Sequence, residues 1–153
     1  DTEMALILDQ LILPSVTDFE PDAIVLQCGA DAVTEDPQSR LTLSSNAHWA
    51  VVAALRPIAP RYLVLGGGGY NPWAVGRLWT GVWATLNGHD IPDVLPPAAQ
   101  GVLGALSWSG PLRQHHPQPH WIATLRDSPR EGAIRDSVRS DVQHLATRRA
   151  VWR

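Results

Sequence analysis

The sequence predicts an α/β fold built on a parallel sheet. Two short apolar runs, 23–26 and 62–65, have the continuous pattern of strands buried on both faces. Segments with helical spacing lie before the first run, between the two and after the second. Such alternation favours parallel strands joined by crossover helices. Ligands of such sheets bind beyond the carboxyl ends of the strands, so we expect a site there.

Each helix of this pattern has sequence signals at its ends. Residues 3–16 form the first, and Pro14 with the stretch 18–21 should end it. The second covers about 48–55, with Ser44 or Ser45 as its N-cap. The third covers 72 to about 87. Its expected N-cap is Asn71, Pro72 is its first residue, and Gly88 follows as C-cap.

Prolines become frequent from Pro92 onward. We therefore divide the chain into residues 1–96, which carry the alternating pattern, and a Pro-rich, partly helical extension, 97–153. Helices are expected near 97–106 and 131–145 in that extension, which should pack on the first part.

Composition limits the classes of partner. The 153 residues carry 12 basic and 15 acidic side chains, a net charge of −3. Nucleic acid is therefore not an expected partner, because phosphate binding needs clustered positive charge. The apolar run 5–13 is too short to span a membrane, so no membrane association is expected. Cys28 is the single cysteine, which excludes an internal disulfide and favours a cytoplasmic protein.

Two features follow the strands directly. Asp31 stands just past the first strand, where a carboxylate can bind a metal, although an isolated Asp there more often caps a loop or helix. Four glycines, 66–69, follow the second strand. They fit neither the Walker loop nor the dinucleotide fingerprint, and a loop with positive φ or close backbone approach is the better interpretation. Tyr70 would project from that loop, either to donate a hydrogen bond to an oxyanion or only to pack against it.

Four segments carry a resemblance to a known family. They are residues 19–31 (FEPDAIVLQCGAD), the pair Asp36-Pro37, residues 65–71 (LGGGGYN) and residues 74–80 (AVGRLWT). In this order and spacing, over about residues 19–96, the chain resembles the zinc-dependent deacetylases of the histone deacetylase and acetoin-utilisation family. The resemblance implies a three-layer α/β/α fold of the arginase/deacetylase type, of which this chain would be the C-terminal portion. Trp73, Trp83 and the turn 87–88 further resemble the bacterial acetoin-utilisation branch.

The resemblance implies hydrolysis of an acetylated amine, typically acetyl-lysine, with a catalytic Zn²⁺ or another divalent metal. That metal would be held by two carboxylates and one His. Asp31 would be one metal ligand, and Tyr70 would be the catalytic residue that stabilises the oxyanion. The remaining residues implied for the loops or the substrate channel are Gly67, Gly68, Gly69, Asp36, Pro37 and Gln38.

The sequence also departs from the family pattern. The family's other ligands, an Asp and a His two residues apart, and its tandem catalytic His pair precede the segment matched here, yet residues 1–30 contain no His. We therefore expect this chain alone to be inactive. His115, His116 and His120 are expected in a solvated Pro-rich loop. Gln38 stands where the resemblance implies an apolar channel residue.

Other functions stay open. A non-catalytic binding or assembly module could retain the fold, the substrate could be an acetylpolyamine or small amide, and the glycine run could bind phosphate. Cys28 is expected in the core, and Arg77 in a structural ion pair.

Overall fold

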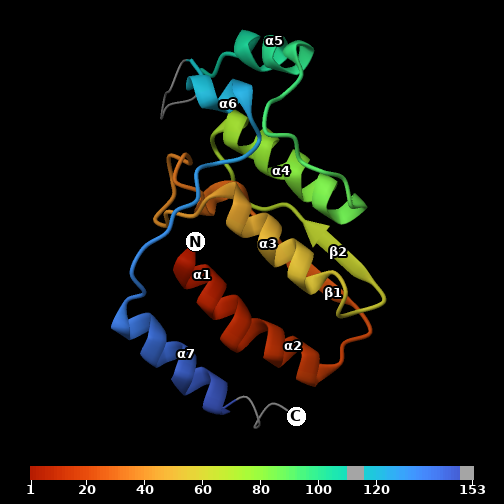
Figure 1. Cartoon of the computed structure of the whole chain (residues 1–153), viewed down its shortest axis with the longest axis vertical. Coiled ribbons are helices and arrows are strands. Elements are labelled where there is room, and N and C mark those ends of the chain that lie inside the picture. The colour runs from red at the N-terminus through yellow and green to blue at the C-terminus, as the bar shows by residue number, and fades with distance from the viewer. Residues whose placement is uncertain (110–115, 149–153) are drawn as a thin grey trace.

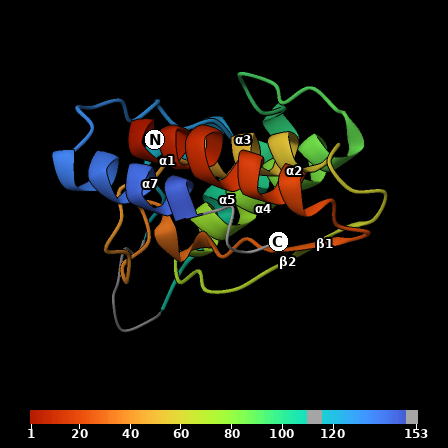
Figure 2. The same cartoon turned by 90° about the horizontal axis from the view of Figure 1, so that it is seen from below.

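The computed structural model of the chain describes residues 1–109 and 116–148 and contains a small parallel sheet with helices on one side (Figures 1 and 2). Strands β1 (Ile24–Gln27) and β2 (Tyr62–Leu65) pair in register, with Ile24 opposite Tyr62. Helix α3 (Ser45–Leu55) connects them, and α4 (Pro72–Asn87) follows β2. The α/β class predicted from the sequence is confirmed.

The two faces of the sheet differ. Alternate residues of each strand point inward, and Leu26, Tyr62 and Val64 pack against the core. The opposite face is exposed: the side chain of Val25 is 63% exposed and that of Leu63 is 53% exposed. The expectation of strands buried on both faces is therefore wrong for the described residues, because their helices cover only the inner face (Figure 2).

The core lies between the sheet, α3 and α4. Trp49 of α3 lies within this core and donates its indole N–H to the carbonyl of Leu78 at 2.9 Å. A Cβ atom at Gly81 of α4 would overlap the Trp49 ring. The absence of a side chain at Gly81 thus lets the two helices approach closely.

The N-cap of α3 and both caps of α4 follow the sequence signals. Ser44 is the N-cap of α3, and its side chain accepts the N–H of Ala47. Asn71 is the N-cap of α4, and its Oδ1 accepts the N–H groups of Trp73 and Ala74. Gly88 ends α4 with φ +70°, a left-handed C-cap.

The N-terminal helix is longer and less regular than predicted. It comprises α1 (Thr2–Ile7), a π-helical turn, Leu8–Ile12, and α2 (Leu13–Phe19). Pro14 does not end the helix. A proline clashes with the carbonyl four residues earlier in a regular α-helix. The wider π turn, in which Leu13 N–H bonds to the carbonyl of Leu8, precedes Pro14 and lets the helix continue.

In the described residues after α4, the chain forms α5 (Pro97–Ala105), α6 (Pro119–Ala123) and α7 (Asp136–Arg148). Helices α5 and α6 pack on each other at the end of α4, and α7 lies beside the π turn of the N-terminal helix (Figure 1). The extended segment between α6 and α7 crosses the molecule. In this part of the chain the sequence predicted two helices and missed α6, whose five residues are too few for a periodic signal.

A buried ion pair fixes the crossing segment. Arg77 of α4 is 1% exposed and contacts Asp127 at 2.6 Å, which confirms the predicted structural role of Arg77. The guanidinium also donates to the carbonyls of Thr124, Leu125 and Arg126. Asp127 in turn accepts the N–H of Ser45 at the start of α3.

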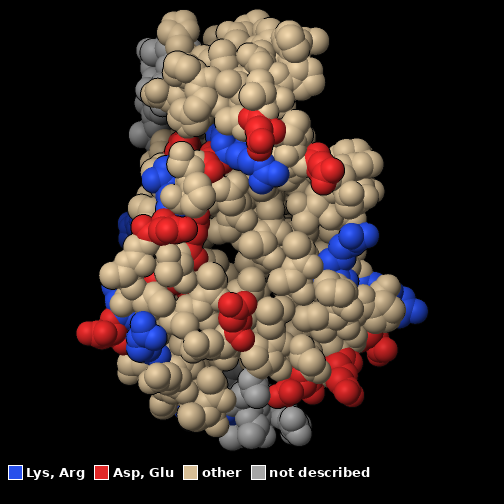
Figure 3. Space-filling view, viewed as in Figure 1, with Lys and Arg blue, Asp and Glu red and all other residues tan. Residues whose placement is uncertain are grey.

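The surface carries charges of both signs. On the face shown in Figure 3 acidic and basic side chains are scattered, and the end formed by α5 and α6 is almost uncharged. Among the described helices, none is long and apolar enough to cross a membrane.

Candidate functional site

The two loops beyond the sheet lie against each other. Asp31 follows β1 in a short 3-10 turn, Ala30–Ala32, and the glycine loop, 66–69, follows β2. Ala30 donates its N–H to the carbonyl of Gly68 at 2.6 Å. The parallel register therefore brings Asp31 and the glycine loop together at the carboxyl edge, as the sequence predicted.

Two glycines allow this approach. A Cβ atom at Gly68 would overlap the carboxylate of Asp31, so this position admits no side chain while the loop lies against Asp31. Gly69 has φ +149°, and its Cβ would meet Val75 at 2.6 Å and Ala30 at 3.0 Å. The prediction of a loop requiring close approach and positive φ is confirmed.

Tyr70 follows the glycine loop directly and is 45% exposed. Its backbone N–H donates to Oδ2 of Asp36 at 2.5 Å. Asp36 is 4% exposed, and its Oδ1 accepts the N–H of Gln38 at 2.9 Å. Asn71, the next residue, donates its Nδ2–H to the carbonyl of Glu35 at 2.9 Å. Residues 35–38 thus hold the backbone around Tyr70.

The other candidate loop residues surround these contacts. Pro37 and Gln38 are exposed at the surface. A Cβ at Gly67 would come within 3.0 Å of Nε2 of Gln27 and 3.1 Å of Cα of Gly29. All eight candidate residues therefore belong to two adjoining loops, and a role of Pro37 and Gln38 in a substrate channel stays a prediction.

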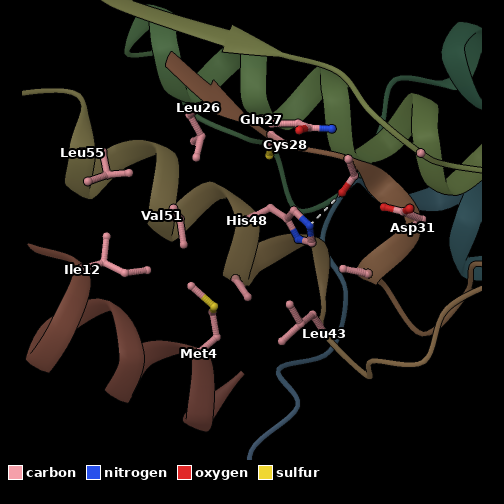
Figure 4. Close-up of a pocket in the computed structure, with 14 residues that line it drawn as sticks. Met4, Ile12, Leu26, Gln27, Cys28, Asp31, Leu43, His48, Val51 and Leu55 are labelled. Carbon is pink, nitrogen blue, oxygen red and sulfur yellow. Dashed lines mark hydrogen bonds between the residues drawn. The ribbon is translucent and has the colours of Figure 1, made fainter. Parts of the chain in front are cut away.

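A cavity of about 440 Å³ opens beside β1 (Figure 4). Apolar side chains of the N-terminal helix and α3 line one end, including Met4, Ile12 and Leu55. His48 and Asp31 lie at the other end. Cavities of this size and mixed lining are typical of small-molecule sites.

His48 does not pair with Asp31 across this cavity. Its Nε2 lies 3.2 Å from the carbonyl oxygen of Gly29, and its Nδ1 lies 3.3 Å from that of Ser44. A carbonyl oxygen can only accept, so His48 donates through whichever ring nitrogen carries a proton. The sequence placed His48 only as the first residue of a helix. No local signal marks its contact with the loop that carries Asp31.

The described residues do not form a complete zinc centre. Catalytic zinc sites use about three protein ligands. Within residues 1–109 and 116–148, no three His, Cys, Asp or Glu side chains gather closely enough to hold a metal ion. Asp31 has the right chemistry for one ligand, because its carboxylate is exposed at the carboxyl edge of the sheet.

Among the remaining candidate groups, Cys28 also lines this cavity. Burial raises the pKa of the Cys28 thiol to about 11, consistent with the expected core position. His116 is exposed as expected, and His120 is also exposed but belongs to α6 rather than to a loop. His115 lies outside the described residues. Trp83 of α4 is 59% exposed and its ring stacks on that of His89, with ring centroids 5.0 Å apart.

Fold and site together define an α/β protein that presents a carboxylate and a phenol at the carboxyl edge of a parallel sheet. Comparison with known proteins identifies its family. The model of the histone deacetylase domain matches residues 1–86, more than half of the chain. The chain therefore belongs to the histone deacetylase family.

Individual relatives agree with this assignment. The chain is 40% identical to putative histone deacetylase 2 of Caenorhabditis elegans over 78 residues, which are 51% of this chain and 15% of that protein. It is 32% identical to acetoin utilization protein AcuC of Bacillus subtilis over 114 residues, covering 66% of this chain and 30% of AcuC. The chain thus spans less than a third of these curated relatives.

Solved structures share the fold. The crystal structure of an HDAC homolog from Aquifex aeolicus superposes with a TM-score of 0.78 at 29% identity, covering 95% of this chain and 39% of that one. An HDAC homolog complexed with SAHA gives a TM-score of 0.69 at 26% identity, covering 88% and 38%.

Proposed function

We propose that this chain forms part of a zinc-dependent deacetylase site that hydrolyses an acetylated amine of the acetyl-lysine type. The observation that carries the proposal is the juxtaposition of Asp31 and the loop bearing Tyr70, within a chain of the histone deacetylase family. Similarity to an HDAC homolog complexed with SAHA supports an acetyl-lysine-like ligand.

In this proposal Asp31 is one metal ligand, and the part of the deacetylase domain that this chain does not cover supplies the others. When bound, zinc polarises an amide carbonyl and lowers the pKa of a water molecule to about 7. Tyr70 donates its phenolic hydrogen bond to the oxygen that becomes negatively charged as the amide is attacked. Its exposed side chain can reach a ligand, and its backbone is held by Asp36.

The three-layer arrangement belongs to the same proposal. The exposed face of β1 and β2 carries Val25, Leu63 and Leu65, which a second layer of helices would cover in the whole deacetylase domain.

We also infer a cytoplasmic location from the lone, buried Cys28.

A chimera tests the function. The segment of the Aquifex aeolicus HDAC homolog that superposes on this chain is replaced by this chain, and zinc-dependent release of acetate from an acetyl-lysine peptide is measured. We expect the chimera to be active and this chain alone to be inactive. Tyr70→Phe should lower kcat by about 10²–10³, the usual effect of losing one oxyanion donor. Asp31→Asn should lower both zinc affinity and rate.

Matched controls separate these effects from folding. Tyr62→Phe removes the only other tyrosine hydroxyl, which is buried without a hydrogen-bond partner, and should leave the rate unchanged. Asp22→Asn removes an exposed carboxylate before β1 and should also be neutral. Full activity in Tyr70→Phe or Asp31→Asn would contradict the proposal.

A non-catalytic module is the second candidate, favoured by the lack of a three-ligand cluster in the described residues. A folded chimera without activity, in an assay where the Aquifex aeolicus parent deacetylates the same peptide, would support it. The phosphate-binding alternative is disfavoured, because the Asn71 side chain already accepts the first N–H groups of α4.

The physiological substrate stays a prediction, with an acetylpolyamine or another small amide as the alternative. Parallel assays of the chimera with an acetyl-lysine peptide and an acetylpolyamine compare the two through their kcat/KM values.

A further inference from the structure

The backbone around Tyr70 is held by a buried carboxylate from the other loop. The glycines before Tyr70 have no side chains to pack against neighbouring residues, and Tyr70 itself is nearly half exposed. Asp36, by contrast, is almost fully buried. Its two oxygens accept from the N–H groups of Tyr70 and Gln38, which lie on different loops.

A carboxylate is needed at position 36 because both of its oxygens accept a hydrogen bond. An ionised carboxylate accepts at both oxygens, and such charge-assisted bonds are about twice as strong as neutral ones. An Asn side chain has one acceptor and one donor group, so at position 36 it can accept only one of the two N–H groups. The second N–H would face an amide NH₂ in a buried place.

A neighbouring bond has a different role. Asn71 connects α4 to the carbonyl of Glu35, and its other side-chain atom caps that helix. That contact holds the helix start, whereas the Asp36 contact holds the tyrosine itself. The contact between Asp36 and Tyr70 therefore holds the tyrosine backbone. The adjacent contact between Glu35 and Asn71 holds the start of α4.

We propose that Asp36 is a positioning residue for Tyr70, acting through the backbone N–H of Tyr70 to set the direction of its phenol. The inference rests on the proposed function for its effect on the reaction, but the effect on the loop is independent of catalysis. A displacement of about 1 Å at a reacting group can lower a rate 10²-fold. A backbone hydrogen bond that fixes the position of the Tyr70 phenol should therefore affect the reaction rate.

The first test uses the full chain labelled with 3-fluorotyrosine. The chain has two tyrosines, so ¹⁹F NMR gives one signal from Tyr70 and an internal reference from Tyr62. We expect Asp36→Asn to broaden the Tyr70 signal or to shift it toward the free amino acid, with the Tyr62 signal unchanged. Asp127→Asn is the matched control, because Asp127 is also a buried carboxylate that accepts a backbone N–H but does not contact Tyr70.

A second measurement needs no substitution and so does not depend on whether a variant folds. In the unsubstituted chain, the amide hydrogen of Tyr70 should exchange with solvent at least ten-fold more slowly than an unprotected amide, although the residue is exposed. An unprotected Tyr70 amide, or an unchanged Tyr70 signal in folded Asp36→Asn, would overturn the inference.

The kinetic test is a double-mutant cycle in the active chimera. Asp36→Asn should lower kcat about ten-fold with little change in KM, and should have no further effect in a Tyr70→Phe background. If Asp36 were needed only for folding, Asp36→Asn would lower kcat by the same factor in both backgrounds. That result would overturn the inference. If Tyr70→Phe alone has no effect, the proposed function fails, while the NMR result on Asp36 still stands or falls separately.

Discussion

At the scale of single residues, burial and charge act against each other at Asp127. Burial alone would raise the pKa of this carboxyl, but the Arg77 charge and the hydrogen bonds from Ser45 and Arg77 outweigh it and lower the pKa. At the surface, the hydrogen bonds from Arg135 lower the pKa of Glu3 to about 2. Both carboxyls are therefore more acidic in the folded chain than in the unfolded one, where Asp and Glu titrate near 4.

This predicts a loss of stability in acid. A carboxyl with a depressed folded pKa stabilises the fold above its unfolded pKa, and that contribution is lost as the pH falls toward the folded value. The free energy of unfolding should thus decrease between about pH 4.5 and pH 2. Urea titrations from pH 2 to pH 7 measure this change.

The Asp127→Asn variant identifies the source of the effect. It should be less stable at pH 7 and should show a shallower acid dependence. Asp22→Asn, at an exposed position, provides the reference. Equal acid dependence in Asp127→Asn and the unsubstituted chain would show that Asp127 does not contribute.

At the scale of elements, two glycines of α4 have opposite surroundings. A Cβ at Gly76 would meet nothing within 4 Å, whereas one at Gly81 would overlap Trp49. Alanine is favoured over glycine by roughly 0.8–1.0 kcal/mol inside a helix. Gly76→Ala should therefore raise the free energy of unfolding by up to about 1 kcal/mol.

Gly81→Ala should instead destabilise the chain, by about 1–3 kcal/mol, because overpacking forces α3 and α4 apart. Chemical denaturation of the two variants, which carry the same substitution in the same helix, measures both effects. A stabilised Gly81→Ala variant would contradict the close packing of these helices.

Local signals predicted many of the elements, and long-range contacts account for what they missed. The strands, the Asn71 cap and the Gly88 end of α4 depend on neighbouring residues, so they could be predicted. Pro14 was misjudged because the usual rule ignores a π turn. The bond from Tyr70 to Asp36 joins residues 34 apart and has no local signature. The exposed sheet face could not be predicted either, since a continuous apolar run indicates two-sided burial without showing which segment would cover each face.

At the scale of the whole molecule, the exposed sheet face is an apolar surface on a small protein. Exposed apolar patches and open strands favour association between copies. Leu63→Lys, in the middle of β2, should therefore increase the monomer fraction at high concentration with little change in stability. Size-exclusion chromatography over a concentration series measures this fraction. Leu106→Lys, at an exposed position after α5, is the control for added charge.

The segment that crosses between α6 and α7 has a consequence for synthesis. Ser45, at the start of α3, donates to Asp127, a residue 82 positions later, and Glu3 pairs with Arg135. At roughly 5–20 residues per second, a ribosome makes Asp127 about 4–16 s after Ser45. During that interval the nascent chain lacks the ion pair of Arg77 with Asp127, and it also lacks the ion pair of Glu3 with Arg135. Early chaperone contact with emerging α3 and α4 would therefore be expected until residue 135 has left the ribosome.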